Sequence, residues 1–129
     1  MKKNYLIVIA DYYEDITRGL LNSALSLIPK SNSIKVIKVP GVFEIPVTIS
    51  KNIKKYDGFL ALGCVIKGET PHFDFISQAS INALMELSIN NKKPIGNGII
   101  TCLNKRQAQA RKKKGAEAAK AVISILSQK

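Results

Sequence analysis

The sequence predicts an α/β domain: a three-layer sandwich in which a four-stranded parallel sheet lies between two layers of helices. Hydrophobic periodicity switches repeatedly between strand type and helix type along the chain, as in alternating α/β folds. Residues 5–10 and 58–66 are continuous apolar runs, typical of strands buried on both faces of a parallel sheet. The chain has 129 residues and is 46% hydrophobic. That is enough apolar material for a single domain, residues 1–129, with its own core.

The first half of the chain contains two predicted strands and two predicted helices. Residues 5–10 (YLIVIA) are the first strand. Apolar side chains at helical spacing follow over residues 14–28, and the next residue is a proline that closes the helix. Residues 33–39 (SIKVIKV) are β-branched and partly alternating, which indicates a strand nearer the sheet edge. A short helix then covers residues 46–53, because its first residue is a proline, which suits a first helical turn.

The second half continues the alternation. Residues 58–66 (GFLALGCVI) are the most hydrophobic segment and the predicted central strand, and residues 72–91 follow as a helix. Residues 94–101 (PIGNGIIT) form a fourth strand, whose two glycines suggest that another part of the structure approaches its backbone closely. Asn104 can cap a short helix over residues 104–111, and a last helix carries the apolar side chains of residues 118–126. The predicted order is β-α-β-α-β-α-β-α-α.

The charge is strongly basic and unevenly distributed. The chain has 20 Lys and Arg against 9 Asp and Glu, a net charge of +11. Residues 101–129 alone contain eight basic side chains and one acidic one, Glu117. This asymmetry fits an anionic macromolecule such as nucleic acid, an anionic small substrate steered by the field, or a solvated basic face.

Cysteine usage and hydropathy indicate where the protein works. Cys64 and Cys102 are the only cysteines, His72 is the only histidine, and no CxxC occurs. A zinc site or a disulfide framework is therefore not expected, and a reducing cytoplasm fits. The longest wholly apolar stretch, residues 6–10, is far shorter than the roughly 18 residues of a membrane span. We expect neither a membrane partner nor a signal peptide.

Right-handed crossovers place helices on both faces of such a sheet, and ligands then bind beyond the carboxyl ends of the strands. The segments at those ends are the places to search for a site. They are residues 10–14, 40–44, 66–72 and 101–104.

The loop after the third strand resembles a phosphate-binding loop with one residue changed. Residues 63–70 (GCVIKGET) match GxxxxGK[ST] except for Glu69, which stands where lysine is required. A carboxylate there would repel the outer phosphates of a nucleotide, so a nucleoside triphosphatase is excluded. A glycine turn before a helix N-terminus can still bind a single phosphate through backbone N–H groups. An ordinary strand-to-helix turn is the alternative.

His72 falls at that helix N-terminus, at the ligand-binding edge of the sheet. The positive end of the helix dipole disfavours imidazolium, so a neutral ring able to pass a proton in either direction is expected near pH 7. A lone histidine is more often structural, but this position favours a function. No serine or cysteine signature of a nucleophilic enzyme accompanies it.

Other side chains predicted near the strand ends suit a planar or anionic ligand. Residues 39–46 (VPGVFEIP) form a turn stiffened by two prolines, either a rigid connector with Glu44 in the first helical turn or a wall presented to a ligand. Tyr12 and Tyr13 follow the first strand and can pack in the core or stack on a heterocycle. Arg111 lies in a basic run, yet its planar guanidinium is a natural partner for phosphate.

Together these segments resemble the 6,7-dimethyl-8-ribityllumazine synthase family. The most specific matches are residues 39–46 and residues 62–74 (LGCVIKGETPHFD), with support from residues 97–99 and 114–115. The similarity covers nearly the whole chain. It implies a flavodoxin-like sandwich that assembles into pentamers, sometimes twelve of them in a shell, with each active site shared by neighbouring subunits.

The resemblance also implies the reaction. The family condenses 5-amino-6-(D-ribitylamino)uracil with 3,4-dihydroxy-2-butanone 4-phosphate and releases phosphate and water, the penultimate step of riboflavin biosynthesis. This chemistry needs proton transfer and a phosphate anchor, but no metal and no other cofactor. The expected partners are two small substrates and further copies of the chain, and no nucleic acid.

The roles that the resemblance assigns fall on thirteen residues. Family members often have phenylalanine at the position of Asn97, where it covers the heterocycle, so asparagine loses that cover. The assigned residues are Tyr12, stacking on the pyrimidine; Val42, Phe43 and Glu44, holding the ribityl chain and ring; Cys64, Val65 and Ile66, lining the pyrimidine pocket; Glu69 and Thr70, binding phosphate through backbone donors; Arg111, joining them from the next subunit or its equivalent face; His72, donating a proton; and Asn97 and Lys114, near the substrates.

Two rival functions remain open from the residues alone. A basic nucleic-acid-binding protein would use the cluster over residues 105–114, with affinity that falls steeply as salt rises. Aromatic content is only 6%, so few rings are available to stack on bases. A flavin-binding carrier of similar topology is the second rival. Formation of the fluorescent lumazine from the two substrates would separate all three.

Overall fold

The computed structural model describes residues 2–68, the backbone of His72, and residues 73–128. Within this part of the chain, strands and helices alternate in the predicted order, with one short 3-10 helix added. The elements are β1 (Asn4–Ala10), α1 (Glu14–Leu25), β2 (Ser33–Val39), η1 (Val42–Glu44), α2 (Ile45–Asn52), β3 (Gly58–Ile66), α3 (His72–Asn91), β4 (Ile95–Cys102), α4 (Lys105–Ala110) and α5 (Lys114–Leu126).

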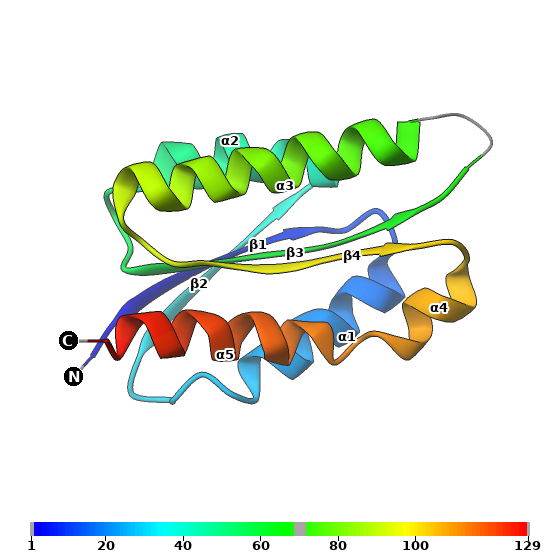
Figure 1. The fold of residues 1–129 in the computed structure, drawn as a ribbon. Coiled ribbons are helices and arrows are strands. Elements are labelled where there is room, and N and C mark those ends of the chain that lie inside the picture. Colours follow the sequence, from blue (N-terminus) through cyan, green and yellow to red (C-terminus); the bar gives the residue numbers. More distant parts are fainter. Residues whose placement is uncertain (1, 69–71, 129) are drawn as a thin grey trace.

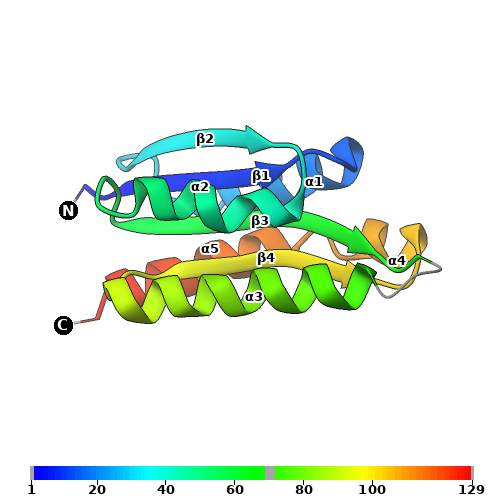
Figure 2. The ribbon, with the colours of Figure 1, turned by 90° about the horizontal axis from the view of Figure 1, so that it is seen from above.

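The four strands form one parallel sheet in the order β2-β1-β3-β4. Helices α2 and α3 cover one face, and α1, α4 and α5 cover the other (Figure 1). Seen from above, α3 lies along the β4 side of the sheet while α2 lies over β1 and β3 (Figure 2). The predicted three-layer α/β sandwich with a flavodoxin-like layout is confirmed. As predicted, β3 is central and β2 is an edge strand.

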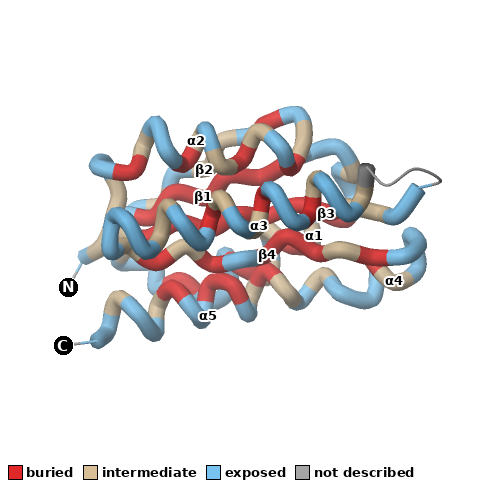
Figure 3. Tube along the Cα trace, turned by 45° about the horizontal axis from the view of Figure 1, so that its top comes forward, coloured by how far each residue is buried: buried red, intermediate tan, exposed pale blue. Residues whose placement is uncertain are grey.

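Each face of the sheet has its own hydrophobic core, because alternate side chains of a strand point to opposite faces. From β1, Tyr5 and Ile7 belong to the cluster beneath α1 and α5, whereas Leu6 and Val8 belong to the cluster beneath α2 and α3. All four are at most 2% exposed. The buried residues are concentrated in the strands, and exposed residues follow the outer faces of the helices (Figure 3). This double burial explains why β1 and β3 are continuous apolar runs.

The predicted helix over residues 14–28 is too long, since α1 ends at Leu25. The Leu27 N–H donates to the carbonyl of Ala24, three residues before it, at 3.1 Å. This spacing forms a tighter turn than the four-residue spacing of an α-helix, so the chain leaves the helix here. Ile28 is still only 3% exposed because the turn returns it to the core that α1 covers. Spacing alone therefore could not distinguish a continued helix from a turn that buries the same side chain.

Most of the other predicted boundaries hold within about one residue, but α5 begins at Lys114, before the apolar residues 118–126 that marked the last helix. Both α2 and β4 are displaced by one position from their predicted ranges. Asn104 caps α4 as predicted, with its Oδ1 accepting from the Gln107 N–H at 2.9 Å. The short helix η1 was not predicted, and it gives the segment before α2 a fixed shape.

The two glycines of β4 make room for neighbouring elements, Gly96 for α5 and Gly98 for a side chain of β3. A Cβ on Gly96 would collide with the Ala118 carbonyl oxygen, and one on Gly98 would meet the side chain of Leu62. The close approach predicted from these glycines is therefore real, and the approaching group at Gly96 is a helix backbone.

We expect Gly96→Ala to destabilise the fold by about 1–3 kcal/mol, because α5 or β4 must shift to admit the methyl group. Gly68→Ala is the matched control, since a Cβ there has no described atom within 4 Å. Thermal or urea unfolding of the two variants gives the comparison. Equal stability of Gly96→Ala and the unsubstituted chain would contradict this account of the β4 glycines.

The carboxyl ends of the strands and the chain termini lie at opposite ends of the molecule (Figure 1). The loops that leave β1 and β4 toward α1 and α4 share the first of these ends, as do the end of β3 and the start of α3. Among the described helices, none has the length and apolar character that crossing a membrane requires.

Candidate active site

A cavity of about 650 Å³ lies at the carboxyl ends of β1 and β3. Its walls come from the loop after β1, from η1, from the end of β3 and from the second turn of α3. It contains seven of the residues predicted for the site. The lining residues are Tyr12, Tyr13, Gly41, Val42, Phe43, Glu44, Cys64, Val65, Ile66 and Ile76.

The η1 wall is rigid because it is anchored from beneath. Val42 is 5% exposed and packs into the core below α2 and α3, while Phe43 beside it is 62% exposed. The Glu44 N–H donates to the Gly41 carbonyl at 3.1 Å, which closes the turn. The Glu44 carbonyl in turn accepts from the Thr48 hydroxyl at 2.9 Å. One aromatic ring and one carboxylate are thus presented to the cavity from a fixed backbone.

The end of β3 supplies an apolar floor. Cys64 is 5% exposed, and Val65 and Ile66 are half-buried. Burial, with smaller contributions from Cys102 and Asp15, raises the pKa of the Cys64 thiol to about 12. The thiol is therefore protonated at neutral pH and serves as a small apolar wall. A thiolate nucleophile is not available here.

This pKa predicts that Cys64 resists alkylation. At pH 8 a thiol with a pKa of about 12 is ionised in only about one molecule in 10⁴, and the side chain is also buried. We expect iodoacetamide to leave the folded protein unmodified and to label both cysteines after denaturation, as read by mass spectrometry. Rapid labelling of Cys64 in the folded protein would show that the thiol is accessible and activated.

Tyr12 and Tyr13 form the side of the cavity that follows β1. Tyr12 is 76% exposed, whereas Tyr13 is half-buried and packs against the core beneath α1 and α5. Their ring centroids are 4.9 Å apart and the rings are nearly perpendicular, at 89°. A large exposed ring at the cavity mouth is suited to stacking on a planar ligand.

A second hollow, of about 520 Å³, lies on the β4 side of the sheet and contains the remaining described site residues. Asn97 lines it from β4, Arg111 from the turn after α4, and Lys114 from the start of α5. The Arg111 guanidinium is exposed and donates to the Thr101 carbonyl at 3.4 Å. Lys114 Nζ lies 3.8 Å from a carboxylate oxygen of Glu117. With Lys113 also present, this hollow is basic and suited to an anion.

The predicted residues are therefore divided between two places. None of the described residues lines both hollows. Because β4 is an edge strand, the basic hollow faces outward at the side of the sheet rather than into the first cavity.

Three predicted residues fall where the structure is not described. Glu69 and Thr70 lie outside the described residues, as does the side chain of His72. The described parts on either side are in the predicted positions: β3 ends at Ile66, and α3 begins at His72. The start of a 20-residue helix thus follows the strand end beside the cavity.

Three cavity residues were not assigned to the site from the sequence. Gly41 belongs to the proline-rich turn, and the sequence fits either a core role or a stacking role for Tyr13. Ile76 is one of the apolar residues whose spacing predicts α3. Its place one turn after His72 was the only available signal that it could face the cavity.

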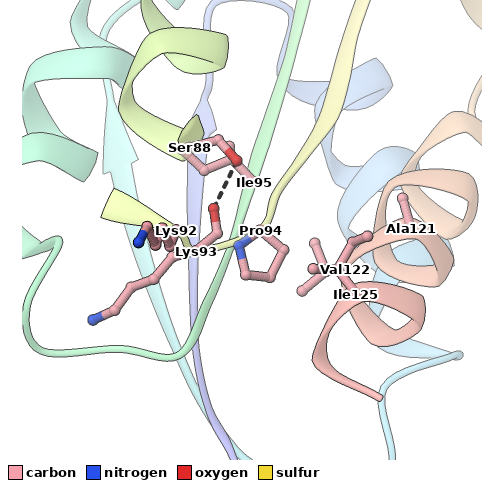
Figure 4. Close-up of a pocket in the computed structure, with 8 residues that line it drawn as sticks. All are labelled: Ser88, Lys92, Lys93, Pro94, Ile95, Ala121, Val122 and Ile125. Atoms are coloured by element: carbon pink, nitrogen blue, oxygen red, sulfur yellow. Dashed lines mark hydrogen bonds between the residues drawn. The ribbon is translucent and has the colours of Figure 1, made fainter. Parts of the chain in front are cut away.

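A third hollow, of about 320 Å³, lies at the opposite end of the molecule, near the start of β4 (Figure 4). Pro94 faces Val122 and Ile125 of α5 across it, and the side chains of Lys92 and Lys93 extend away from α5. The Ser88 hydroxyl donates to the Lys93 carbonyl at 2.7 Å. None of the described site residues lines this hollow, and its lining is mainly apolar.

Comparison with known proteins gives a consistent result. A family model described as 6,7-dimethyl-8-ribityllumazine synthase matches residues 2–129. The 6,7-dimethyl-8-ribityllumazine synthase of Bartonella tribocorum is 43% identical, with 99% of this chain and 91% of the relative covered. The proteins of that name from Bartonella henselae and Agrobacterium fabrum are 44% and 42% identical, each over 99% of this chain and over 89% and 95% of their own lengths.

Proposed function

The chain belongs to the 6,7-dimethyl-8-ribityllumazine synthase family, and from this premise we propose that the cavity at the strand ends and the basic hollow beside β4 are the two halves of one active site. The protein is a transferase acting on small molecules. It condenses 5-amino-6-(D-ribitylamino)uracil with 3,4-dihydroxy-2-butanone 4-phosphate to 6,7-dimethyl-8-ribityllumazine, in riboflavin biosynthesis. The observation that carries the proposal is the cavity between η1 and β3, which is lined by seven of the thirteen residues predicted for the site.

The cavity is proposed to bind the pyrimidine. Its volume, about 650 Å³, lies within the roughly 300–1,000 Å³ of ordinary small-molecule sites. Tyr12 stacks on the heterocycle, while Cys64, Val65 and Ile66 provide the apolar floor beneath it. The residues of η1, with the Glu44 carboxylate as hydrogen-bond acceptor, hold the ribityl chain.

The phosphate-bearing substrate is proposed to bind between the loop before α3 and the basic hollow. Backbone N–H groups of Glu69 and Thr70, which precede α3 in the sequence, are proposed to bind the phosphate. The Arg111 guanidinium adds a planar set of donors, and Lys114 adds positive charge beside it. Asn97, on β4 of the same hollow, contacts the ligand with a polar amide in place of an aromatic cover.

In the reaction, the 5-amino nitrogen attacks the ketone carbon and water leaves as the imine forms. Proton loss from the adjacent carbon then expels phosphate and leaves an enol, which takes up a proton at its terminal carbon and becomes a ketone. The ribitylamino nitrogen attacks this ketone carbon and closes the ring with loss of a second water. His72 is proposed to carry the protons, which contributes about 10²- to 10⁴-fold. Alignment of the amine with the ketone is the larger contribution, up to about 7–11 kcal/mol of the barrier.

We further propose that the active site is completed by a neighbouring copy of the chain, in a pentamer or a 60-subunit shell. The division of the predicted residues between two separate hollows supports this, since one copy alone does not bring them together. Large apolar side chains are exposed on α2 and α3, as expected for surfaces that pack against another copy: Val47, Phe75, Met85 and Ile89. Sedimentation velocity measures the assembly, and a monomer at micromolar concentration would contradict it. A cytoplasmic location belongs to the same proposal.

The activity itself is tested by mixing the purified chain with both substrates and following the fluorescence of the lumazine product. The expected result is product formation that depends on both substrates and on the protein, above the slow background reaction. Affinity for DNA that falls with salt, without lumazine formation, would favour the nucleic-acid-binding alternative.

A further inference from the structure

The ring pair formed by Tyr12 and Tyr13 joins the cavity mouth to the core. Tyr12 is 76% exposed, and a side chain that free would ordinarily sample several rotamers. Its described aromatic neighbour is Tyr13, in an edge-to-face arrangement with a centroid separation of 4.9 Å. Orientation of the exposed ring therefore depends on where Tyr13 is held.

The backbone of Tyr13 is fixed by the start of α1. Its carbonyl accepts from the Thr17 N–H at 2.9 Å and the Ile16 N–H at 3.1 Å, and from the Thr17 hydroxyl at 3.2 Å. Thr17 is itself 1% exposed. Tyr13 is the N-cap residue of α1 and provides no side-chain cap, so its ring is available for packing.

The ring of Tyr13 is held between the core and Tyr12. It packs against the buried cluster beneath α1 and α5, and it lines the cavity together with Cys64. Burial raises the pKa of Tyr13, and Tyr12 and Cys64 raise it further, so its hydroxyl stays neutral at working pH. The Tyr13 side chain is therefore uncharged and cannot bind a substrate through an ion pair.

We propose that Tyr13 is a positioning residue, which holds the ring of Tyr12 at the angle needed to stack on the pyrimidine. This inference rests on the proposed function of the cavity. An edge-to-face aromatic pair is worth about 2- to 12-fold in an equilibrium beyond its buried area. Loss of the pair should therefore weaken pyrimidine binding by a factor in that range.

The first test compares Tyr13→Leu with Tyr13→Phe. Leucine keeps apolar bulk but removes the ring, and we expect KM for the pyrimidine to rise about 3- to 10-fold with kcat changed less than about 2-fold. Phenylalanine keeps the ring edge and should restore the KM of the unsubstituted chain. Tyr13→Met provides a second variant without a ring in case leucine disturbs folding, and thermal unfolding is recorded for all of them.

The second test repeats Tyr13→Leu in a Tyr12→Ala background. If Tyr13 acts through Tyr12, the added substitution changes KM no further, because the ring to be positioned is already absent. The same fold-change in both backgrounds, or an unchanged KM for Tyr13→Leu alone, would overturn the inference while leaving the enzyme assignment intact. Absence of lumazine formation by the unsubstituted chain would instead overturn the proposed function, and the role of Tyr13 with it.

Discussion

Replacement of His72 by alanine should lower kcat by about 10²- to 10⁴-fold, the usual contribution of a positioned acid or base. Pyrimidine affinity should change little, because the described walls of the cavity come from the loop after β1, from η1, from β3 and from Ile76. Rapid mixing at saturating substrates gives kcat, and titration with a pyrimidine analogue lacking the 5-amino nucleophile gives affinity. Glu86→Ala, at an exposed position on the same helix, controls for general effects of altering α3.

The two measurements separate a role in proton transfer from a role in binding. Loss of pyrimidine binding with an unchanged rate at saturation would assign His72 to binding instead of proton transfer.

Replacement of Arg111 by alanine should raise KM for 3,4-dihydroxy-2-butanone 4-phosphate by about 10- to 100-fold. A hydrogen bond to a charged group is worth about 1.5–3 kcal/mol, and the guanidinium is exposed and ready to bind phosphate. KM for the pyrimidine should change less than about 3-fold, because Arg111 does not line the pyrimidine cavity.

Arg106→Ala is the matched control for Arg111→Ala. Arg106 is exposed on α4 in the same basic region but does not line the hollow. The control removes the same charge, so equal effects of the two substitutions would indicate general steering by the positive field. An unchanged KM in Arg111→Ala would remove this residue from the site.

The sequence predicted the layers of the fold because burial determines the pattern of each strand. The double burial of β1 and β3 produces continuous apolar runs, and the half-exposed edge strand β2 produces a mixed one. The end of α1 could not be predicted, since Ile28 is buried whether the helix continues or turns. The glycines of β4 predicted that some group lies close to the backbone at Gly96. They could not identify that group as the Ala118 carbonyl, because Ala118 is distant in sequence.

Seven of the predicted site residues line one cavity, and Arg111 lies in a separate hollow, which agrees with the shared site that the family resemblance implies. Residues 39–46 and the end of β3 indicated one cavity, and the structure brings Phe43 and Cys64 together there. That Arg111 lies in a different hollow depends on the path of β4 and α4, which local patterns do not determine. The edge-to-face packing of the Tyr12 ring against the Tyr13 ring is likewise set by the three-dimensional structure, and the two neighbouring residue types do not predict it.

The most direct test of a shared site is to mix two damaged chains. His72→Ala and Arg111→Ala are unfolded together, reassembled in equal amounts, and assayed for lumazine formation at low phosphate-substrate concentration. If neighbours each supply one half of the site, random assembly restores about one quarter of the sites with both residues intact. Activity should then far exceed the sum of the two variants assayed alone. A mixture no more active than that sum would contradict the account and place both residues in the active site of a single chain.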